Sequence, residues 1–215
     1  MIKQKIKNKK LKKSSRDWLA RQINDPFVVL AKKEGYRSRA SFKILEIQEK
    51  FKIFKKNSTV IDLGAAPGGW SQVISKVCTN KIIAIDLLEM DPLPNVEFIK
   101  GDFLDQENIS KINTLLNGKK ADIIMSDMAP STCGIQKVDH IRIMNLIEEV
   151  FEFCKESLEI GGTMVVKVFQ GGAEQNFLKE LKTYFQKIQH FKPKSSRKES
   201  PETYLIALGF KGLSN

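Results

Sequence analysis

A run of small residues within segment 60–70 has the character of a cofactor-binding turn. Residues 60–63 are mostly apolar and β-branched, as is typical of a strand buried on both faces of a parallel sheet. The glycines and alanines from Gly64 to Gly69 allow a tight turn and a close approach of a ligand to the backbone. Helical spacing resumes at Trp70. The pattern therefore predicts a strand, a turn and a helix whose first amides face an anionic group on a ligand.

Three further segments read as strands that end in an aspartate. The aspartates are Asp86, Asp102 and Asp127, at the ends of segments 81–86, 96–102 and 121–127. A single aspartate at the end of a strand is more often a helix cap or a turn residue. Three of them at one edge of a parallel sheet indicate a ligand site, because ligands bind at the carboxyl ends of the strands. Asp86 follows Gly64 by 22 residues, a spacing that suits a carboxylate bound to ribose hydroxyls.

Two lysines have the position and type for proton chemistry. Lys167 lies inside a predicted strand, residues 163–171, where a buried lysine costs stability unless it is paired. We therefore expect it to have an acidic neighbour or a chemical task. Lys43 borders the buried stripe of a predicted helix, whose inward residues are Ala40, Ile44, Ile47 and Phe51. It is a surface lysine unless other polar groups converge on it.

Alternating strands and helices must position these residues. An amphipathic region covers residues 14–33, and a helix is predicted over 139–158, ended by Gly161 and Gly162. The apolar spacing predicts another helix over 173–187. A basic segment, 194–199, leads to a last strand at 202–208. This order predicts a three-layer α/β fold, with residues 14–215 forming one domain.

The positive charge of the chain is concentrated near its start. The formal net charge is +11, and residues 44–215 hold 22 basic and 22 acidic residues. Residues 1–43 hold 14 basic residues and only three acidic ones, Asp17, Asp25 and Glu34. Residues 1–13 contain seven lysines and no acid, which predicts a disordered basic arm that either binds nucleic acid or acts as a solubilising tail.

Composition argues against several other classes of protein. No apolar run approaches the length needed to cross a bilayer, so no membrane association is expected. Three cysteines without a C-x-x-C pair and two histidines disfavour a disulfide scaffold and a metal site. These features predict a cytoplasmic protein with reduced thiols.

Four motifs follow one another along the chain: Arg37-Ser-Arg-Ala-Ser-Phe-Lys43, Asp62-Leu-Gly-Ala-Ala-Pro-Gly-Gly-Trp-Ser-Gln72, Ser126-Asp-Met-Ala-Pro130 and Val165-Val-Lys-Val-Phe-Gln-Gly171. Together they resemble the motifs of one known family, the FtsJ ribosomal-RNA 2′-O-ribose methyltransferases. The resemblance runs from about Ser14 to Lys211. It implies a Rossmann-like class I domain that uses S-adenosylmethionine. It also implies a seven-stranded, mostly parallel sheet whose last strand is antiparallel.

The resemblance also implies site residues by position. A Lys-Asp-Lys-Glu tetrad falls on Lys43, Asp127, Lys167 and Glu202. Glu202 lies in the loosest match, and Glu199 is its alternative. The cofactor-binding residues of the family fall on Gly68, Trp70, Asp86, Asp102 and Asp127, and no metal is implied.

These residue types suit transfer of a methyl group to a ribose hydroxyl. The displacement is in line, so alignment of oxygen, carbon and sulfur supplies much of the rate. The hydroxyl must also lose a proton, and we expect Lys167 to accept it as a neutral amine. Lys43 is expected to hold the ribose and lower the pKa of that amine, Asp127 to lie between amine and cofactor, and Glu202 to orient the lysines.

We therefore expect a monomeric enzyme that methylates a uridine ribose in large-subunit ribosomal RNA. Three alternatives remain: a transfer-RNA 2′-O-methyltransferase, a nicotinamide oxidoreductase, and a non-catalytic RNA-binding protein of the same fold. The turn lacks a clean G-x-G-x-x-G, which disfavours the oxidoreductase. A complete tetrad disfavours the non-catalytic protein. The sequence leaves open which nucleotide is methylated, and whether free RNA or an assembled subunit is the substrate.

Overall fold

The computed structural model describes residues 12–130, 133–169 and 175–212, which contain seven helices and seven strands. The helices are α1 Lys13–Ile23, α2 Pro26–Glu34, α3 Ala40–Phe51, α4 Gly69–Ile74, α5 Gln106–Leu116, α6 Gln136–Ser157 and α7 Gln175–Tyr184. The strands are β1 Val60–Leu63, β2 Ile82–Asp86, β3 Val96–Lys100, β4 Ala121–Ser126, β5 Leu158–Phe169, β6 Phe185–Phe191 and β7 Glu202–Phe210.

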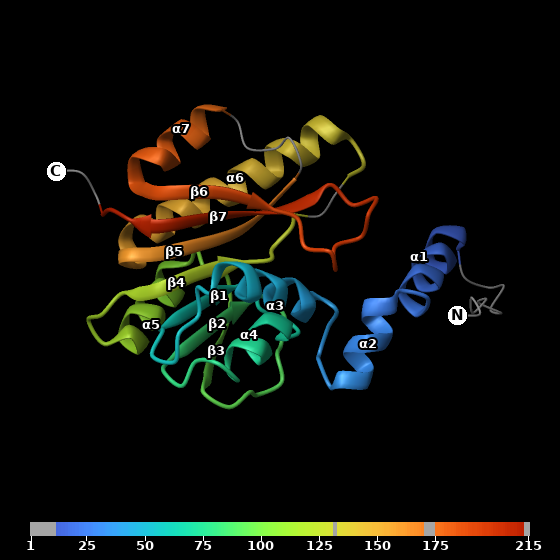
Figure 1. Cartoon of the computed structure of the whole chain (residues 1–215), viewed down its shortest axis with the longest axis horizontal. Coiled ribbons are helices and arrows are strands. Elements are labelled where there is room, and N and C mark those ends of the chain that lie inside the picture. The colour runs from blue at the N-terminus through green and yellow to red at the C-terminus, as the bar shows by residue number, and fades with distance from the viewer. Residues whose placement is uncertain (1–11, 131–132, 170–174, 213–215) are drawn as a thin grey trace.

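The strands form a single sheet in the order β3-β2-β1-β4-β5-β7-β6 (Figure 1). Strands β1 to β5 pair in parallel, whereas β7 is antiparallel to both of its neighbours, β5 and β6. The mostly parallel sheet and the antiparallel last strand are therefore confirmed. The four strands predicted before residue 130 are also confirmed, to within two residues at each end.

Helices cover both faces of the sheet, as the predicted three-layer fold requires. On one face α3 and α4 pack on the sheet, through a buried cluster that includes Ile44, Ile47, Trp70, Val165 and Ile206. On the other face α5, α6 and α7 pack through Ile112, Phe151, Phe177, Leu181 and many strand residues. Residues 165 and 166 belong to opposite clusters, because successive strand side chains point to opposite faces.

The helix predicted over 173–187 is confirmed from Gln175 to Tyr184, and the prediction was wrong for residues 185–187. Helix α7 ends at Tyr184, and Phe185 begins strand β6, which the sequence reading did not identify. The apolar spacing from Phe177 through Leu181 to Phe185 continues a helical period across this junction, so periodicity did not mark the change. Strand β5 also begins earlier than predicted, at Leu158, directly after α6.

The first two helices extend away from the sheet (Figure 1). Asp25 caps α2 by accepting a hydrogen bond from the Phe27 amide at 3.0 Å. The predicted basic arm, residues 1–13, lies outside the described residues apart from Lys12 and Lys13, and Lys13 begins α1. No helix in the described part of the chain is long and apolar enough to span a membrane.

Candidate active site

The candidate site lies at the carboxyl ends of β1 and β4, where the strand order of the sheet reverses. Strand β1 lies between β2 and β4, so the chain moves outward in opposite directions from this point. Such a switch point is the usual ligand site of an open α/β sheet. Gly64 follows β1, Asp86 ends β2, and Asp127 follows β4. The ends of β2, β1 and β4 are thus adjacent in the sheet, and Asp102 follows β3, the next strand beyond β2.

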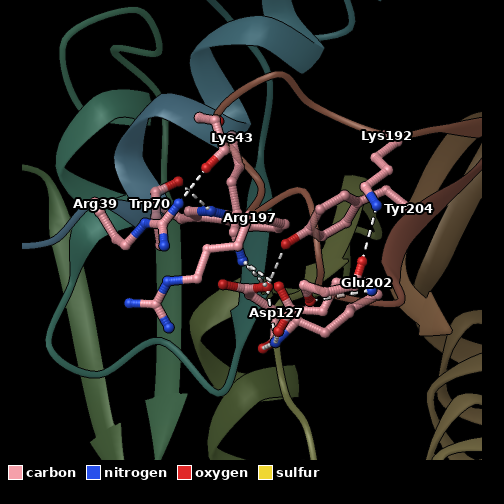
Figure 2. A network of polar contacts seen from close by, with 12 residues as sticks. Arg39, Lys43, Trp70, Asp127, Lys192, Arg197, Glu202 and Tyr204 are labelled. Atoms are coloured by element: carbon pink, nitrogen blue, oxygen red, sulfur yellow. Dashed lines mark hydrogen bonds and ion pairs between the residues drawn. The ribbon is translucent and has the colours of Figure 1, made fainter. Parts of the chain in front are cut away.

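The four tetrad residues predicted from the resemblance meet at the carboxyl ends of these strands. Figure 2 shows three of them, Lys43, Asp127 and Glu202. The Nζ atoms of Lys167 and Lys43 lie 3.0 and 3.4 Å from Asp127 Oδ1. Lys43 Nζ also lies 3.4 Å from Glu202 Oε2, and Lys167 Nζ lies 3.9 Å from Glu202 Oε1. Glu202 therefore makes the contacts with both lysines, whereas its alternative, Glu199, lines an adjoining pocket.

Strand register explains how three of these side chains come together. Lys167 on β5 is the direct partner of Tyr204 on the antiparallel β7. Glu202 lies two residues before Tyr204, so the strand period of two places both side chains on one face. That face is covered by α3, which carries Lys43. Both lysines are only 6–7% exposed, so Lys43 is not the surface lysine that its sequence position allowed.

The electrostatics of Asp127 favour the ionised carboxylate. Burial alone would raise the pKa of Asp127, but the nearby Lys167 and Lys43 ammonium groups and a hydrogen bond from Tyr204 hold it below its usual value. Lys167 Nζ also donates to the Asp127 backbone oxygen at 2.5 Å. The carboxylate is therefore a fixed negative charge that aligns two cationic side chains.

Tyr204 is a site residue that the sequence analysis missed. Its hydroxyl donates to Asp127 Oδ1 at 2.5 Å, and its ring lies 5.5 Å from that of Trp70. Burial, reinforced by the charge of Asp127, raises the pKa of Tyr204 well above 10, so the hydroxyl stays a donor. Its place two residues after Glu202 on a predicted strand was the available signal.

A pocket of about 560 Å³ opens beside the cluster, within the size range of small-molecule sites. Two predicted cofactor residues, Asp86 and Asp102, line it together with Gly64 and Met128. Asp86 Oδ2 also accepts from the Ala66 amide at 2.9 Å and so supports the turn after β1. The pocket joins the ends of β1, β2, β3 and β4, and can hold an extended molecule.

The close approach of Met128 explains one glycine of the turn. Gly64 has φ +74°, and a Cβ atom there would lie 2.0 Å from the Met128 side chain. Any other residue would therefore clash and strain the backbone. The segment after β4 therefore lies directly against the turn after β1, and Gly64 and Met128 both line the pocket.

Gly68 and Trp70 lie on the other side of the turn. Gly68 caps α4 at φ +97°, beside the Arg37 guanidinium. Arg37 donates to the backbone oxygens of Asp91 at 2.7 Å and Pro92 at 2.8 Å, so it holds residues 91–92 beside the turn that contains Gly68. The Trp70 indole is buried and donates to the Ala40 oxygen at 2.9 Å. Trp70 lines a small cavity with Asp62 and Asp127, rather than the larger pocket.

Asp62 is a buried acid at this cavity that the sequence analysis did not single out as a site residue. It belongs to β1, and its Oδ2 accepts from the Ser71 hydroxyl at 2.6 Å. Burial raises the pKa of Asp62 to about 7, while the Ser71 hydrogen bond opposes the rise and the charges of Asp127 and Asp86 add to it. The strand end thus holds a carboxyl group that titrates near neutral pH.

The loop before Glu202 is fixed by carboxylates from two distant elements. Glu46 on α3 accepts hydrogen bonds from the Lys194 and Ser195 amides at 2.6 and 2.8 Å. Asp25, the cap of α2, forms ion pairs with Arg39 at 2.6 Å and Arg197 at 3.1 Å. Arg39 also donates to the Ser195 backbone oxygen. These contacts hold segment 192–201 and, with it, the start of β7.

The chain is similar to known proteins over most of its length. Residues 36–210 match the family model described as FtsJ-like methyltransferase. A Rickettsia bellii protein named ribosomal RNA large subunit methyltransferase E is 51% identical over 95% of this chain and 92% of its own length. A Rhodopseudomonas palustris protein of the same name is 48% identical over 94% of this chain and 88% of its own length. A solved Plasmodium falciparum structure, described as a ribosomal RNA methyltransferase, is 37% identical with a TM-score of 0.75 over 83% of this chain and 100% of that one.

Proposed function

Because the chain belongs to the FtsJ-like methyltransferase family, we propose that it transfers a methyl group from S-adenosylmethionine to a ribose 2′-hydroxyl of large-subunit ribosomal RNA. The convergence of Lys43, Asp127, Lys167 and Glu202 at the strand ends carries this proposal. Membership of this family favours a methyltransferase over a nicotinamide oxidoreductase as the interpretation of the glycine-rich turn.

The names of the relatives support ribosomal RNA over transfer RNA as the substrate. Proteins that are 48 to 51% identical over nearly the whole chain are named for the large ribosomal subunit. A uridine is the proposed acceptor within that RNA. The four tetrad side chains lie close enough to act together, which argues against a purely RNA-binding role.

The pocket lined by Asp86 and Asp102 fits S-adenosylmethionine in size and in donor chemistry. Asp86 would accept from the ribose hydroxyls, and Asp102 would hold the adenine end of the pocket. Gly68 and Trp70 would contribute backbone atoms at the turn, and Asp127 would face the reactive end. The bound cofactor would supply an electrophilic methyl group to the acceptor oxygen.

The residues of the chain would divide the proton and positioning work. Lys167 would accept the proton of the acceptor hydroxyl during methyl transfer, for which it must first give up the proton that it carries beside Asp127 and become a neutral amine. Asp127 and Tyr204 fix the position of Lys167. Lys43 holds the ribose oxygen, and Glu202 orients Lys43 from 3.4 Å. Burial of both lysines excludes water from the proton transfer.

The Lys167→Ala substitution tests this proposal. Removal of a general base typically lowers the rate by about 10² to 10⁴, so we expect a loss of that size in single-turnover methylation of undermethylated large ribosomal subunits. Saturating subunits isolate the chemical step from binding. Calorimetry should give an unchanged dissociation constant for S-adenosylmethionine, because Lys167 does not line the cofactor pocket.

Lys120→Ala is the matched control. Lys120 is an exposed lysine that directly precedes β4, so it lies at the opposite end of the strand from the site. This variant should methylate at the wild-type rate. A Lys167→Ala enzyme with a near wild-type rate would reject the proposed base. A wild-type protein that binds S-adenosylmethionine but methylates neither large subunits nor free ribosomal RNA would reject the proposed substrate.

A further inference from the structure

A second pocket, of about 380 Å³, adjoins the tetrad on the side of the N-terminal helices. We name it the arginine pocket. Helix α1, the start of α3 and segment 197–202 form it. Its lining residues are Arg21, Gln22, Arg39, Lys43, Arg197, Glu199, Ser200 and Glu202. Two of them, Lys43 and Glu202, are tetrad residues, so the pocket opens directly onto the proposed site of methyl transfer.

The charges of this pocket favour an anion. Four cationic side chains line it against two carboxylates. Asp25 lies behind Arg39 and Arg197 and pairs with both, so a single negative charge is shared by two guanidinium groups. One positive charge is therefore left between them. Guanidinium groups bind phosphate through a planar set of donors, which makes arginine the usual residue for phosphate recognition.

The two arginines are held in place before any ligand binds. Arg39 and Arg197 side chains are 17% and 28% exposed, and the Asp25 side chain is 6% exposed. Among the described residues, Arg39 Nε and Arg197 Nη2 are buried and have no hydrogen-bond partner. Buried charged donors without acceptors cost free energy, so this arrangement serves poorly as a purely structural ion pair. Burial also lowers the pKa of Arg39 against the opposing effect of Asp25, which reflects the same incomplete compensation.

We propose that the arginine pocket binds a phosphodiester group of the RNA strand next to the acceptor ribose, through Arg39 and Arg197, with Arg21 at its rim. This inference rests on the proposed function, because it places the neighbouring nucleotide of the same substrate. Lys43 lies between the pocket and Asp127, so a strand that enters over the arginines reaches the tetrad with its next ribose (Figure 2). The pocket would thus set which ribose along the strand meets Lys167.

The test compares Arg197→Ala and Arg21→Ala with the wild type on undermethylated large ribosomal subunits, in phosphate-free buffer. Each variant should raise KM for the subunits about tenfold, the usual effect of losing a hydrogen bond to a charged group. Each should also reduce the slope of log KM against log salt concentration by about 1, because one phosphate contact is lost. The dissociation constant for S-adenosylmethionine should stay unchanged, because neither arginine lines the cofactor pocket.

Two further measurements separate binding from folding. Arg21 is exposed on α1, so Arg21→Ala should keep the wild-type melting temperature even if Arg197→Ala lowers it by freeing Asp25. Lys119 is an exposed lysine just before β4, at the opposite end of the strand from the site. Lys119→Ala removes the same charge there and should change neither KM nor the salt slope. Wild-type KM and salt slope in both arginine variants would overturn the phosphate site while leaving the methyltransferase proposal intact. Absence of wild-type methylation would instead reject the proposed function.

Discussion

Asp62 gives the site a pH dependence that can be measured on the unliganded protein. Its pKa is about 7 in the folded chain, against about 3.9 for an unfolded aspartate. Between these values the folded state binds more protons than the unfolded state, so the contribution of Asp62 to stability falls as the pH rises from about 4 to 7. Below pH 4 that contribution is fully present.

Asp62→Asn should remove this dependence while keeping an acceptor for the Ser71 hydroxyl. We expect the free energy of unfolding of the variant, relative to wild type, to rise by up to about 4 kcal/mol between pH 4 and pH 7. Urea unfolding of both proteins across this range measures it. A constant difference at all pH values would mean that Asp62 ionises normally in the folded protein.

The sequence alone could predict that Lys167 needs an acidic partner or a chemical task, but not the arrangement around it. A lysine inside a buried strand demands a partner, and the structure supplies Asp127 from the neighbouring strand. Lys43 can be buried only because it has a polar partner, and that partner, Asp127, lies more than 80 residues further along the chain. Tyr204 was missed because its contact with Asp127 depends on the register in which β7 pairs with β5, and no local pattern specifies that register.

At the scale of the elements, periodicity predicted the strands that end in the site better than the outer edge of the sheet. Strands β1, β2, β3 and β4 are short apolar runs bounded by turn residues, which is a strong signal for buried parallel strands. Strand β6 is an edge strand with exposed polar residues, and it follows α7 without a loop. Its sequence therefore resembles the continuation of an amphipathic helix.

Helix α3 does more than carry Lys43, because Glu46 on the same helix holds the loop that precedes Glu202. Glu46→Ala leaves the amides of Lys194 and Ser195 without their acceptor. We expect a loss of about 1 to 3 kcal/mol in the free energy of unfolding. Hydrogen exchange should also become faster in residues 192–201, relative to the strands of the sheet.

Glu49→Ala provides the control for that measurement. Glu49 is an exposed glutamate on the same helix, so its loss should leave exchange in residues 192–201 at the wild-type rate. Equal exchange in the two variants would show that other contacts, such as those of Arg39 and Asp25, hold the loop without Glu46.

For the whole molecule, we expect the charge distribution to divide RNA binding between two regions, the basic arm and the arginine pocket. Arg37 and Arg39 belong to the basic first 43 residues of the chain but lie outside the basic arm. Arg37 donates to backbone oxygens near the turn, whereas Arg39 lines the arginine pocket. Sequence could locate the excess of positive charge but could not tell which arginines the fold itself uses, because that depends on carbonyl groups distant in the chain.

The basic arm, residues 1–11 of which lie outside the described part of the chain, is expected to add affinity rather than position the acceptor. Residues 1–11 contain five lysines and no acid. Deleting residues 2–11 should weaken binding to large ribosomal subunits and reduce the salt slope, because each phosphate neutralised by a lysine releases counterions. The single-turnover rate at saturating subunits should stay at the wild-type value, since the tetrad and the arginine pocket are unchanged. A variant with glutamine at these five lysines keeps the length of the arm and should behave like the deletion. An unchanged salt slope in both would assign the arm to solubility, and all phosphate contacts to the folded domain.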